Sequence, residues 1–185
     1  AVDDSTAVAD DDLADLRTRV LAQIRFPWQE VLPGWRIEFL PERRGYRGST
    51  FPGEEVIRIY RRAGSTLADY VHVTAHELGH AVDVSLLDDA DHRLWNLTRS
   101  RDADAGWWVA SGADDFSSGA GDWAECFAAW QVGPSGFQSE LAGPPDDTIV
   151  ALIAHLSLHN GDFRGAADAA SGQDDFPISR LKPTG

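Results

Sequence analysis

Five apolar residues near the start of the chain recur at helical spacing: Leu13, Leu16, Val20, Leu21 and Ile24. This spacing places them on one face of a helix. Pro27 cannot continue a helix, because its ring clashes with the preceding turn and it lacks an N–H. The pattern predicts a helix from about Leu13 to Phe26, after an acidic lead-in over residues 1–12 that carries charge without periodicity.

Two short stretches alternate apolar and polar residues and are bounded by Pro and Gly: Trp35–Leu40 and Glu55–Tyr60. Alternation with a period of two is typical of strands. Three later segments have helical periodicity: Thr66 to about Leu87, about Trp123 to Gln131, and Asp146–His159. The last one should end at Asn160-Gly161, a common C-terminal cap pair. We expect loops between the helix that ends near Leu87 and the one that begins near Trp123. Residues 162–185 should form an irregular tail.

Chain length and composition place the protein in the globular class. Of 185 residues, 43% are hydrophobic and 25% are charged, ordinary values for one domain with its own core. The elements predict a single α+β domain over residues 1–185. No apolar run approaches the roughly 20 residues of a membrane span.

The chain is strongly acidic, with a formal net charge of −14. Such a surface repels phosphate backbones and anionic lipids, so we expect neither a nucleic-acid nor a membrane partner. Cys126 is the only cysteine, which excludes an intramolecular disulfide. The absence of Met, even at position 1, suggests a processed N-terminus. We therefore expect a secreted, monomeric protein.

The segment that carries recognisable chemistry is His76-Glu77-Leu78-Gly79-His80, an HExxH motif inside the longest predicted helix. Residues four apart lie about one turn apart on a helix, so both imidazoles can bind one metal ion. The motif predicts a zinc site, with Glu77 beside it to act on water. Five residues with three fixed positions also occur by chance, and the alternative is a surface helix that carries two histidines.

A catalytic zinc ion needs a third protein ligand. Metzincins place Gly and His where this chain has Asp83 and Leu86, so that class is excluded. The only glutamates after His80 are Glu125 and Glu140. Glu140 lies among Gly and Pro residues, whereas Glu125 opens a predicted helix, and we predict that Glu125 is the third ligand.

Glu125 also has a structural interpretation. Asp122-x-x-Glu125 matches a capping box, in which the glutamate bonds back to the start of its own helix. A glutamate that binds metal cannot easily do both. We predict a ligand role for Glu125, and an N-cap role for Asp122 in either case.

The sequences AHELGHAVD (75–83) and WAECFAAW (123–130) resemble the gluzincins, and most closely the catalytic-domain family of anthrax lethal factor. In that group a long segment separates the HExxH motif from the third ligand, and a Phe-Ala pair follows that ligand. Here Glu125 follows His80 by 45 residues and precedes Phe127-Ala128. The resemblance covers about Thr66 to Gln131. It implies a zincin-like fold, in which the active-site helix packs under a small mixed sheet and a second helix carries the Glu ligand. It also implies an edge strand that takes substrate as an added strand, for which Glu55–Tyr60 is our candidate.

One position departs from the family pattern. The lethal-factor group carries a Tyr seven residues before the third ligand that is thought to stabilise the oxyanion, and this chain has Ser118 there. No Tyr follows Tyr70. The remaining candidate donors are Ser118, the upstream Tyr46, Tyr60 and Tyr70, another histidine, or the zinc ion itself.

Several further polar residues lie near the motif in sequence. Asp83 could orient a ligand histidine or be a helix-surface charge, and Asp122 is a second candidate for an outer role. His72 would make a third ligand too distant along a straight helix, so we expect it to face solvent or to support a ligand. The Asp-rich loops, including Asp114 and Asp115, lack the EF-hand arrangement and are interpreted as solvated charge.

Three functions compete. The first is a zinc metalloendopeptidase that hydrolyses peptide or protein substrates, with Glu77 as general base and His76, His80 and Glu125 as zinc ligands. The second is a zincin-shaped zinc-binding or toxin-associated module with little or no turnover, which the missing Tyr favours and the intact Glu77 disfavours. The third, a helical scaffold without metal, is disfavoured by the coincidence of two histidines and a glutamate.

Overall fold

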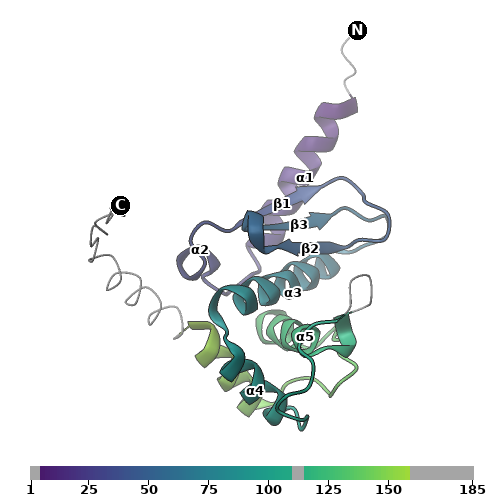
Figure 1. Ribbon diagram of the computed structural model, residues 1–185. Helices are drawn as coiled ribbons and strands as arrows, with labels where there is room; N and C mark the ends of the chain where they lie inside the picture. The colour runs from purple at the N-terminus through teal and green to yellow at the C-terminus, as the bar shows by residue number, and fades with distance from the viewer. Residues whose placement is uncertain (1–4, 110–114, 159–185) are drawn as a thin grey trace, which may run out of the picture.

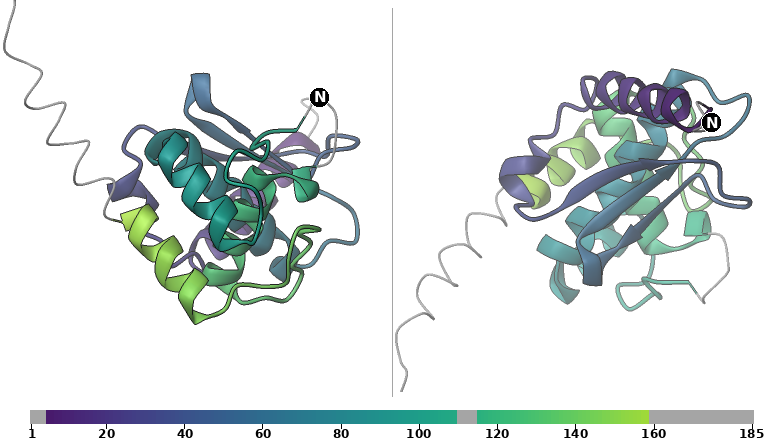
Figure 2. Two further views of the ribbon diagram at one scale, coloured as in Figure 1. Left: turned by 60° about the horizontal axis from the view of Figure 1, so that its bottom comes forward. Right: turned by 90° about the horizontal axis from the view of Figure 1, so that it is seen from above.

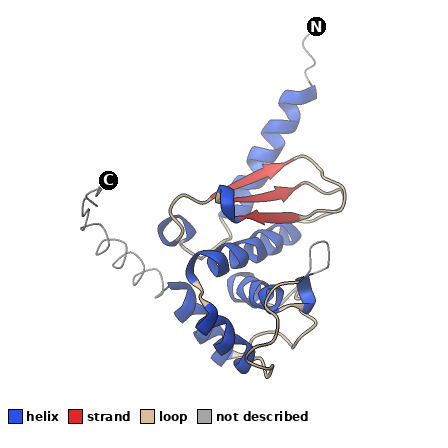
Figure 3. Cartoon of the chain, in the orientation of Figure 1, coloured by secondary structure: helices blue, strands red, loops and turns tan. Residues whose placement is uncertain are grey.

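The computed structural model describes residues 5–109 and 115–158. These residues form a mixed α+β fold in which one small sheet lies on one side of a long helix, α3, and a second helix, α5, packs on the other side (Figure 1). Seen from above, the strands lie in front of the helices (Figure 2). Figure 3 shows the same separation between strands and helices. No helix among the described residues is long and apolar enough to cross a membrane.

The sheet has three strands: β1 (Arg36–Leu40), β2 (Gly48–Phe51) and β3 (Val56–Tyr60). Their spatial order is β1-β3-β2, with β1 parallel and β2 antiparallel to β3. A 3₁₀ turn, η1 (Pro52–Glu54), joins β2 to β3. The two strands predicted from alternation are confirmed as β1 and β3.

The prediction that Glu55–Tyr60 forms the edge strand is wrong. Four of the five residues of β3 are buried, as expected for a strand that is paired on both sides. The edge strand next to α3 is β2, which the sequence analysis missed. Its sequence, Gly-Ser-Thr-Phe, has one large apolar residue and therefore no readable alternation.

Helix α3 (Leu67–Leu86) confirms the longest predicted helix. A capping box marks its start, because the Thr66 hydroxyl accepts from the Asp69 N–H while the Asp69 carboxylate accepts from the Thr66 N–H. Leu78, Ala81 and Val82 are fully buried between the sheet and α5. The helix is buried along most of its length, and it therefore holds its polar residues in fixed positions.

Helix α5 (Gly119–Val132) starts four residues earlier than predicted. Its N-cap is Ser118, whose hydroxyl accepts from the Gly121 N–H at 3.0 Å. Asp122 lies inside the helix, so its predicted N-cap role is wrong. Gly119, Ala120 and Gly121 have no apolar periodicity, so the sequence does not predict the first turn of α5.

At the N-terminus, α1 (Ser5–Leu21) replaces most of the predicted lead-in, so residues 5–12 are helical. The helix ends before the predicted Phe26, and a short helix, α2 (Trp28–Val31), follows Pro27. Helix α1 packs on α3 and β1, and Leu13 and Val20 are buried there. The buried residues of α1 thus belong to the apolar face that the periodicity predicted.

Two further helices complete the described chain. Helix α4 (Asp89–Thr98) lies where loops were expected, and Asp88 starts it with a capping box to Asp91. Residues 147–158 are helical, in agreement with the predicted helix after Asp146, whose carboxylate accepts from the Ile149 N–H at 2.9 Å. The predicted cap at Asn160-Gly161 and the tail 162–185 lie outside the described residues.

A buried ion pair joins α4 to α5. Arg99 donates to both carboxylate oxygens of Asp122 at 2.8 and 2.9 Å, and the side chains of Arg99 and Asp122 are 6% and 0% exposed. The Trp95 indole N–H and the Ser139 hydroxyl donate to the same carboxylate. The pair therefore holds together three segments that are distant in sequence.

We expect Asp122→Ala to lower the free energy of unfolding by about 3–5 kcal/mol, because it leaves a buried guanidinium without a counter-charge. The exposed pair Arg93–Asp104 supplies the matched control, and Asp104→Ala should cost no more than about 1 kcal/mol. Urea denaturation of both variants measures the difference. Equal costs would show that the buried pair contributes no more than a surface pair.

Candidate metal centre and active-site cleft

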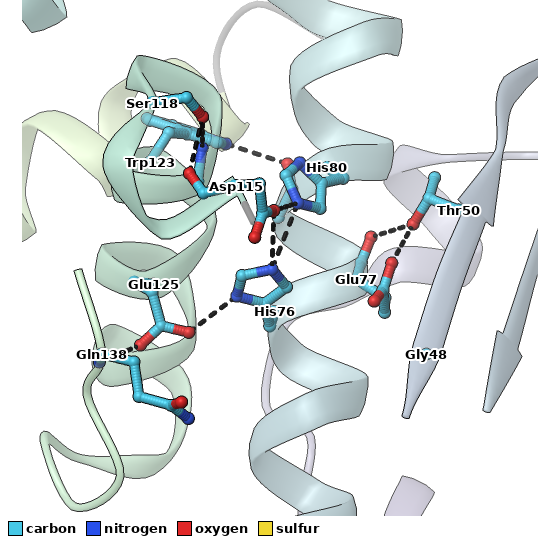
Figure 4. A network of polar contacts seen from close by, with 12 residues as sticks. Gly48, Thr50, His76, Glu77, His80, Asp115, Ser118, Trp123, Glu125 and Gln138 are labelled. Carbon is cyan, nitrogen blue, oxygen red and sulfur yellow. Dashed lines mark hydrogen bonds and ion pairs between the residues drawn. The ribbon is translucent and has the colours of Figure 1, made fainter. Parts of the chain in front are cut away.

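The two motif histidines lie on one face of α3, as their spacing predicts, and face the start of α5 (Figure 4). The Nε2 atoms of His76 and His80 are 3.2 Å apart. A carboxylate oxygen of Asp115 lies 2.8 Å from Nε2 of His80 and 3.3 Å from Nε2 of His76. Three donor atoms therefore converge on one point at the surface of α3.

The backbone at the start of α5 determines where Asp115 lies. Asp115 opens a 3₁₀ turn, η2 (Asp115–Ser117), and its carbonyl oxygen accepts from both the N–H and the hydroxyl of Ser118. A Cβ at Gly121 would lie 2.0 Å from that carbonyl oxygen, so only glycine allows this approach. The cap of α5 thus brings Asp115 to the histidines.

Glu125, the predicted third ligand, lies on the other side of the His76 ring. Its Oε1 is 2.7 Å from Nδ1 of His76 and 3.2 Å from Nε2 of His72, and its Oε2 accepts from the Gln138 N–H at 2.6 Å. Glu125 is 1% exposed and makes none of the contacts of a helix cap. The structure therefore excludes the capping interpretation and pairs Glu125 with two histidines, one of which is the buried His72.

The charges of this cluster are strongly coupled. Burial lowers the pKa of His76, but its hydrogen bonds with Asp115 and Glu125 outweigh this effect and raise the pKa to about 10. Burial raises the pKa of Glu125, but His72 and His76 more than reverse this and bring the pKa to about 2. In the same way, His76 and His80 hold the pKa of Asp115 far below its ordinary value. These contacts therefore favour a positive charge on His76, between the two carboxylates.

The donor set fits a divalent metal ion. A tetrahedral zinc ion with bonds of about 2.0–2.1 Å holds its ligand atoms about 3.3 Å apart, close to the distances among His76, His80 and Asp115. These three residues offer ligand atoms that all lie within 4.8 Å of one another. Glu125 pairs with Nδ1 of His76, and Nε2 of the same ring faces His80 and Asp115. A cation there would replace the proton that His76 otherwise carries.

The candidate metal centre opens into a cleft of about 740 Å³. The cleft is lined by most of β2 and the segment before it, and by Trp108, Val109 and Phe116. The Trp108 side chain is 57% exposed, and its ring centroid lies 6.5 Å from that of His80. An exposed apolar wall beside the histidines is suited to a side chain of a bound molecule.

Glu77 lines the same cleft and is 8% exposed. The Thr50 hydroxyl, on β2, lies 2.7 Å from Oε2 of Glu77 and 3.0 Å from its backbone oxygen (Figure 4). The structure therefore brings together the candidate base and the histidine pair. The exposed Glu140 does not line the cleft, in agreement with the preference for Glu125 over Glu140.

Comparison of the chain with protein-family models, with curated proteins and with solved structures finds no match. The chemistry of the site therefore carries the assignment of a function.

Both residues predicted to support the ligands have other partners. Asp83 accepts from the Trp107 indole at 2.8 Å and lies 2.7 Å from Nε2 of His92, so it fixes α4 and the 101–109 segment instead of His76 or His80. Asp122 accepts from Arg99, Trp95 and Ser139 and contacts no motif histidine. Neither carboxylate contacts a motif histidine, because each is used by partners in α4 or in the segments after it.

Most of the candidate oxyanion donors have other partners in the structure. The Ser118 hydroxyl caps α5 and donates to Asp115, which leaves it without a second proton to donate. Tyr70 donates to the Arg62 carbonyl and does not line the cleft. Tyr60 contacts Arg43 and is also absent from the cleft wall. Among the three tyrosines, only Tyr46 lines the cleft.

Two residues that the sequence analysis did not propose are part of the site. Asp115 had been grouped with solvated loop aspartates, and nothing in its sequence context separates it from Asp114. Thr50 lies in a strand that gave no alternation. A helix start at Ser118-x-x-Gly121 would place Asp115 in the turn that precedes α5.

Proposed function

We propose that this chain is a zinc-dependent metallopeptidase of the zincin type. The convergence of His76, His80 and a carboxylate in a cleft that also contains Glu77 carries the proposal. When bound, zinc supplies a Lewis acid that lowers the pKa of water and polarises a carbonyl group. The long helix under a small mixed sheet agrees with the zincin architecture that the sequence resemblance implies.

His76 and His80 would hold the metal through their Nε2 atoms. Asp115 supplies the third donor in the arrangement described, while Glu125 orients His76 through Nδ1. For Glu125 to bind the ion, as the sequence predicts, either its carboxylate or the His76 ring must rotate. Both assignments retain the open position that catalysis requires.

Glu77 would act as the general base. Its carboxylate would accept a proton from the attacking water and deliver it to the nitrogen of the departing amine. It follows His76 directly on the helix face that lines the cleft, and a residue at a structural metal site would need no such carboxylate there. The intact Glu77 is therefore the main support for turnover.

Strand β2 offers a docking place for an extended peptide. It lines the cleft and pairs only with β3 within the described part of the chain, so one row of its backbone N–H and C=O groups has no strand partner. A peptide added along β2 would lie in the cleft that the histidines and Trp108 also line. The proposed substrate is accordingly an extended segment of a peptide or protein.

The test combines metal analysis with proteolysis. The purified chain should contain one zinc ion and cleave an unfolded protein substrate such as casein, and a chelator should abolish cleavage until zinc is restored. Absence of stoichiometric zinc would contradict the metal centre.

One observation favours a second function, a zinc-binding module of the same shape without turnover. Ser118 replaces the family tyrosine, and its hydroxyl is used in the cap of α5. In that case the same experiment gives stoichiometric zinc but no cleavage.

A further inference from the structure

Strand β2 and the Glu77 side chain approach each other unusually closely. A Cβ built on Gly48 would lie 2.6 Å from Oε1 of Glu77, 2.7 Å from its Cγ and 2.9 Å from Cγ1 of Val73. Real Cβ atoms do not come this near to other heavy atoms. The glycine therefore leaves the space that the Glu77 side chain occupies.

Two residues further along β2, Thr50 contacts Glu77 at two points. Its hydroxyl lies 2.7 Å from Oε2 and 3.0 Å from the backbone oxygen of Glu77. Side chains at positions i and i+2 of a strand point to the same face, so Gly48 and Thr50 present one surface to α3. Figure 4 shows Thr50 extending from the strand toward Glu77.

From these contacts we infer that Gly48 and Thr50 are positioning residues for the Glu77 carboxylate. Gly48 provides the space beside Oε1, and the Thr50 hydroxyl holds Oε2. The strand that would receive the peptide thus also orients the base that acts on it, an inference that rests on the proposed function.

The hydrogen-bond inventory of Thr50 supports this role. A hydroxyl has one proton to donate and two lone pairs. While Glu77 is a carboxylate, the hydroxyl can donate to Oε2, the shorter of the two contacts. This contact ties one oxygen of the Glu77 carboxylate to β2.

The substitutions Thr50→Val and Thr50→Ser separate the hydroxyl from the shape of the side chain. Valine keeps the branched shape and removes the hydroxyl, whereas serine keeps the hydroxyl. We expect Thr50→Val to lower kcat at least about tenfold with KM within about threefold of wild type, because a displaced base loses proper alignment. Thr50→Ser should retain kcat within about threefold. Thr98→Val removes an exposed hydroxyl on α4 and is the matched control, with unchanged kcat.

Crystal structures of the zinc-loaded variants give a readout that does not depend on turnover. The Glu77 carboxylate should remain within about 0.5 Å of its wild-type position in Thr50→Ser. It should move away from β2 in Gly48→Ala and lose its fixed orientation in Thr50→Val, while zinc content stays close to wild type.

The inference is overturned if Thr50→Val keeps both wild-type kcat and the wild-type Glu77 orientation, or if Thr50→Ser is impaired as strongly as Thr50→Val. A wild-type chain that binds zinc without cleaving peptides would refute the proposed function, and the structures would still decide whether β2 positions Glu77.

Discussion

Zinc binding should be lost when either motif histidine becomes alanine, and the carboxylate variants should identify the third ligand. In the arrangement described, Asp115 lies within reach of both Nε2 atoms, whereas Glu125 contacts His76 at the opposite nitrogen, Nδ1. We therefore expect Asp115→Asn to weaken zinc binding by more than the roughly 10- to 100-fold that an orienting carboxylate contributes. Glu125→Gln should stay within that 10- to 100-fold range. Competition with a chromophoric chelator measures both affinities.

Glu140→Gln is the control for removing a carboxylate, since Glu140 is exposed and does not line the cleft. Its zinc affinity should equal that of the wild type. The opposite order, with Glu125→Gln the more damaging change, would show that Glu125 binds the ion, as the sequence predicts. Zinc should also raise the unfolding temperature by joining α3 to the start of α5, with about 2.7 kcal/mol of added stability at free zinc 100-fold above Kd. An unchanged midpoint with and without chelator would contradict a metal that joins these segments.

Glu77→Gln should keep zinc and the fold but lower kcat at least about 10²-fold, the usual contribution of a positioned general base. The glutamine amide has nearly the shape of the carboxylate and can still contact Thr50, so the change removes the basic oxygen and little else. Steady-state hydrolysis of a fluorogenic peptide, together with zinc content and thermal unfolding, measures this. Near-normal hydrolysis by the zinc-loaded variant would eliminate Glu77 as the base.

The two predictions depend on different residues and can fail separately. If the ligand variants lose zinc while Glu77→Gln remains active, the metal centre is correct and the base must be found elsewhere in the cleft. If zinc binds and the wild type does not turn over, the use of the Ser118 hydroxyl in the cap of α5 becomes the leading explanation. Tyr46 is the one tyrosine of the cleft wall, and it is the first residue to examine as an oxyanion donor in an active enzyme.

Local signals were sufficient for α3, β1 and β3. Helix α3 combines a capping box at Thr66 with apolar positions at helical spacing over twenty residues. The HExxH spacing alone places His76 and His80 one turn apart, because that distance is a property of the helix. The prediction of a two-histidine site with an adjacent glutamate thus needed no knowledge of the rest of the chain.

Local signals failed where the outcome depended on distant segments. Strand β2 has almost no apolar pattern and exists because β3 pairs with it. Asp122 was assigned to a cap from its sequence neighbours, yet it lies inside α5 and binds Arg99 from α4. Asp83 likewise follows the motif on α3 but accepts from Trp107, which lies 24 residues later in the chain.

The sequence by itself determined the element that carries the chemistry. It is a long, capped helix with two histidines one turn apart and a glutamate directly after the first of them. Only the tertiary structure decided which carboxylates reach those histidines and which strand borders Glu77. Asp115 and Glu125 occupy opposite sides of one imidazole because α5 starts at Gly119 and packs against α3. Helix periodicity is a short-range property of the chain, whereas the position of a side chain across an interface depends on how two whole elements pack.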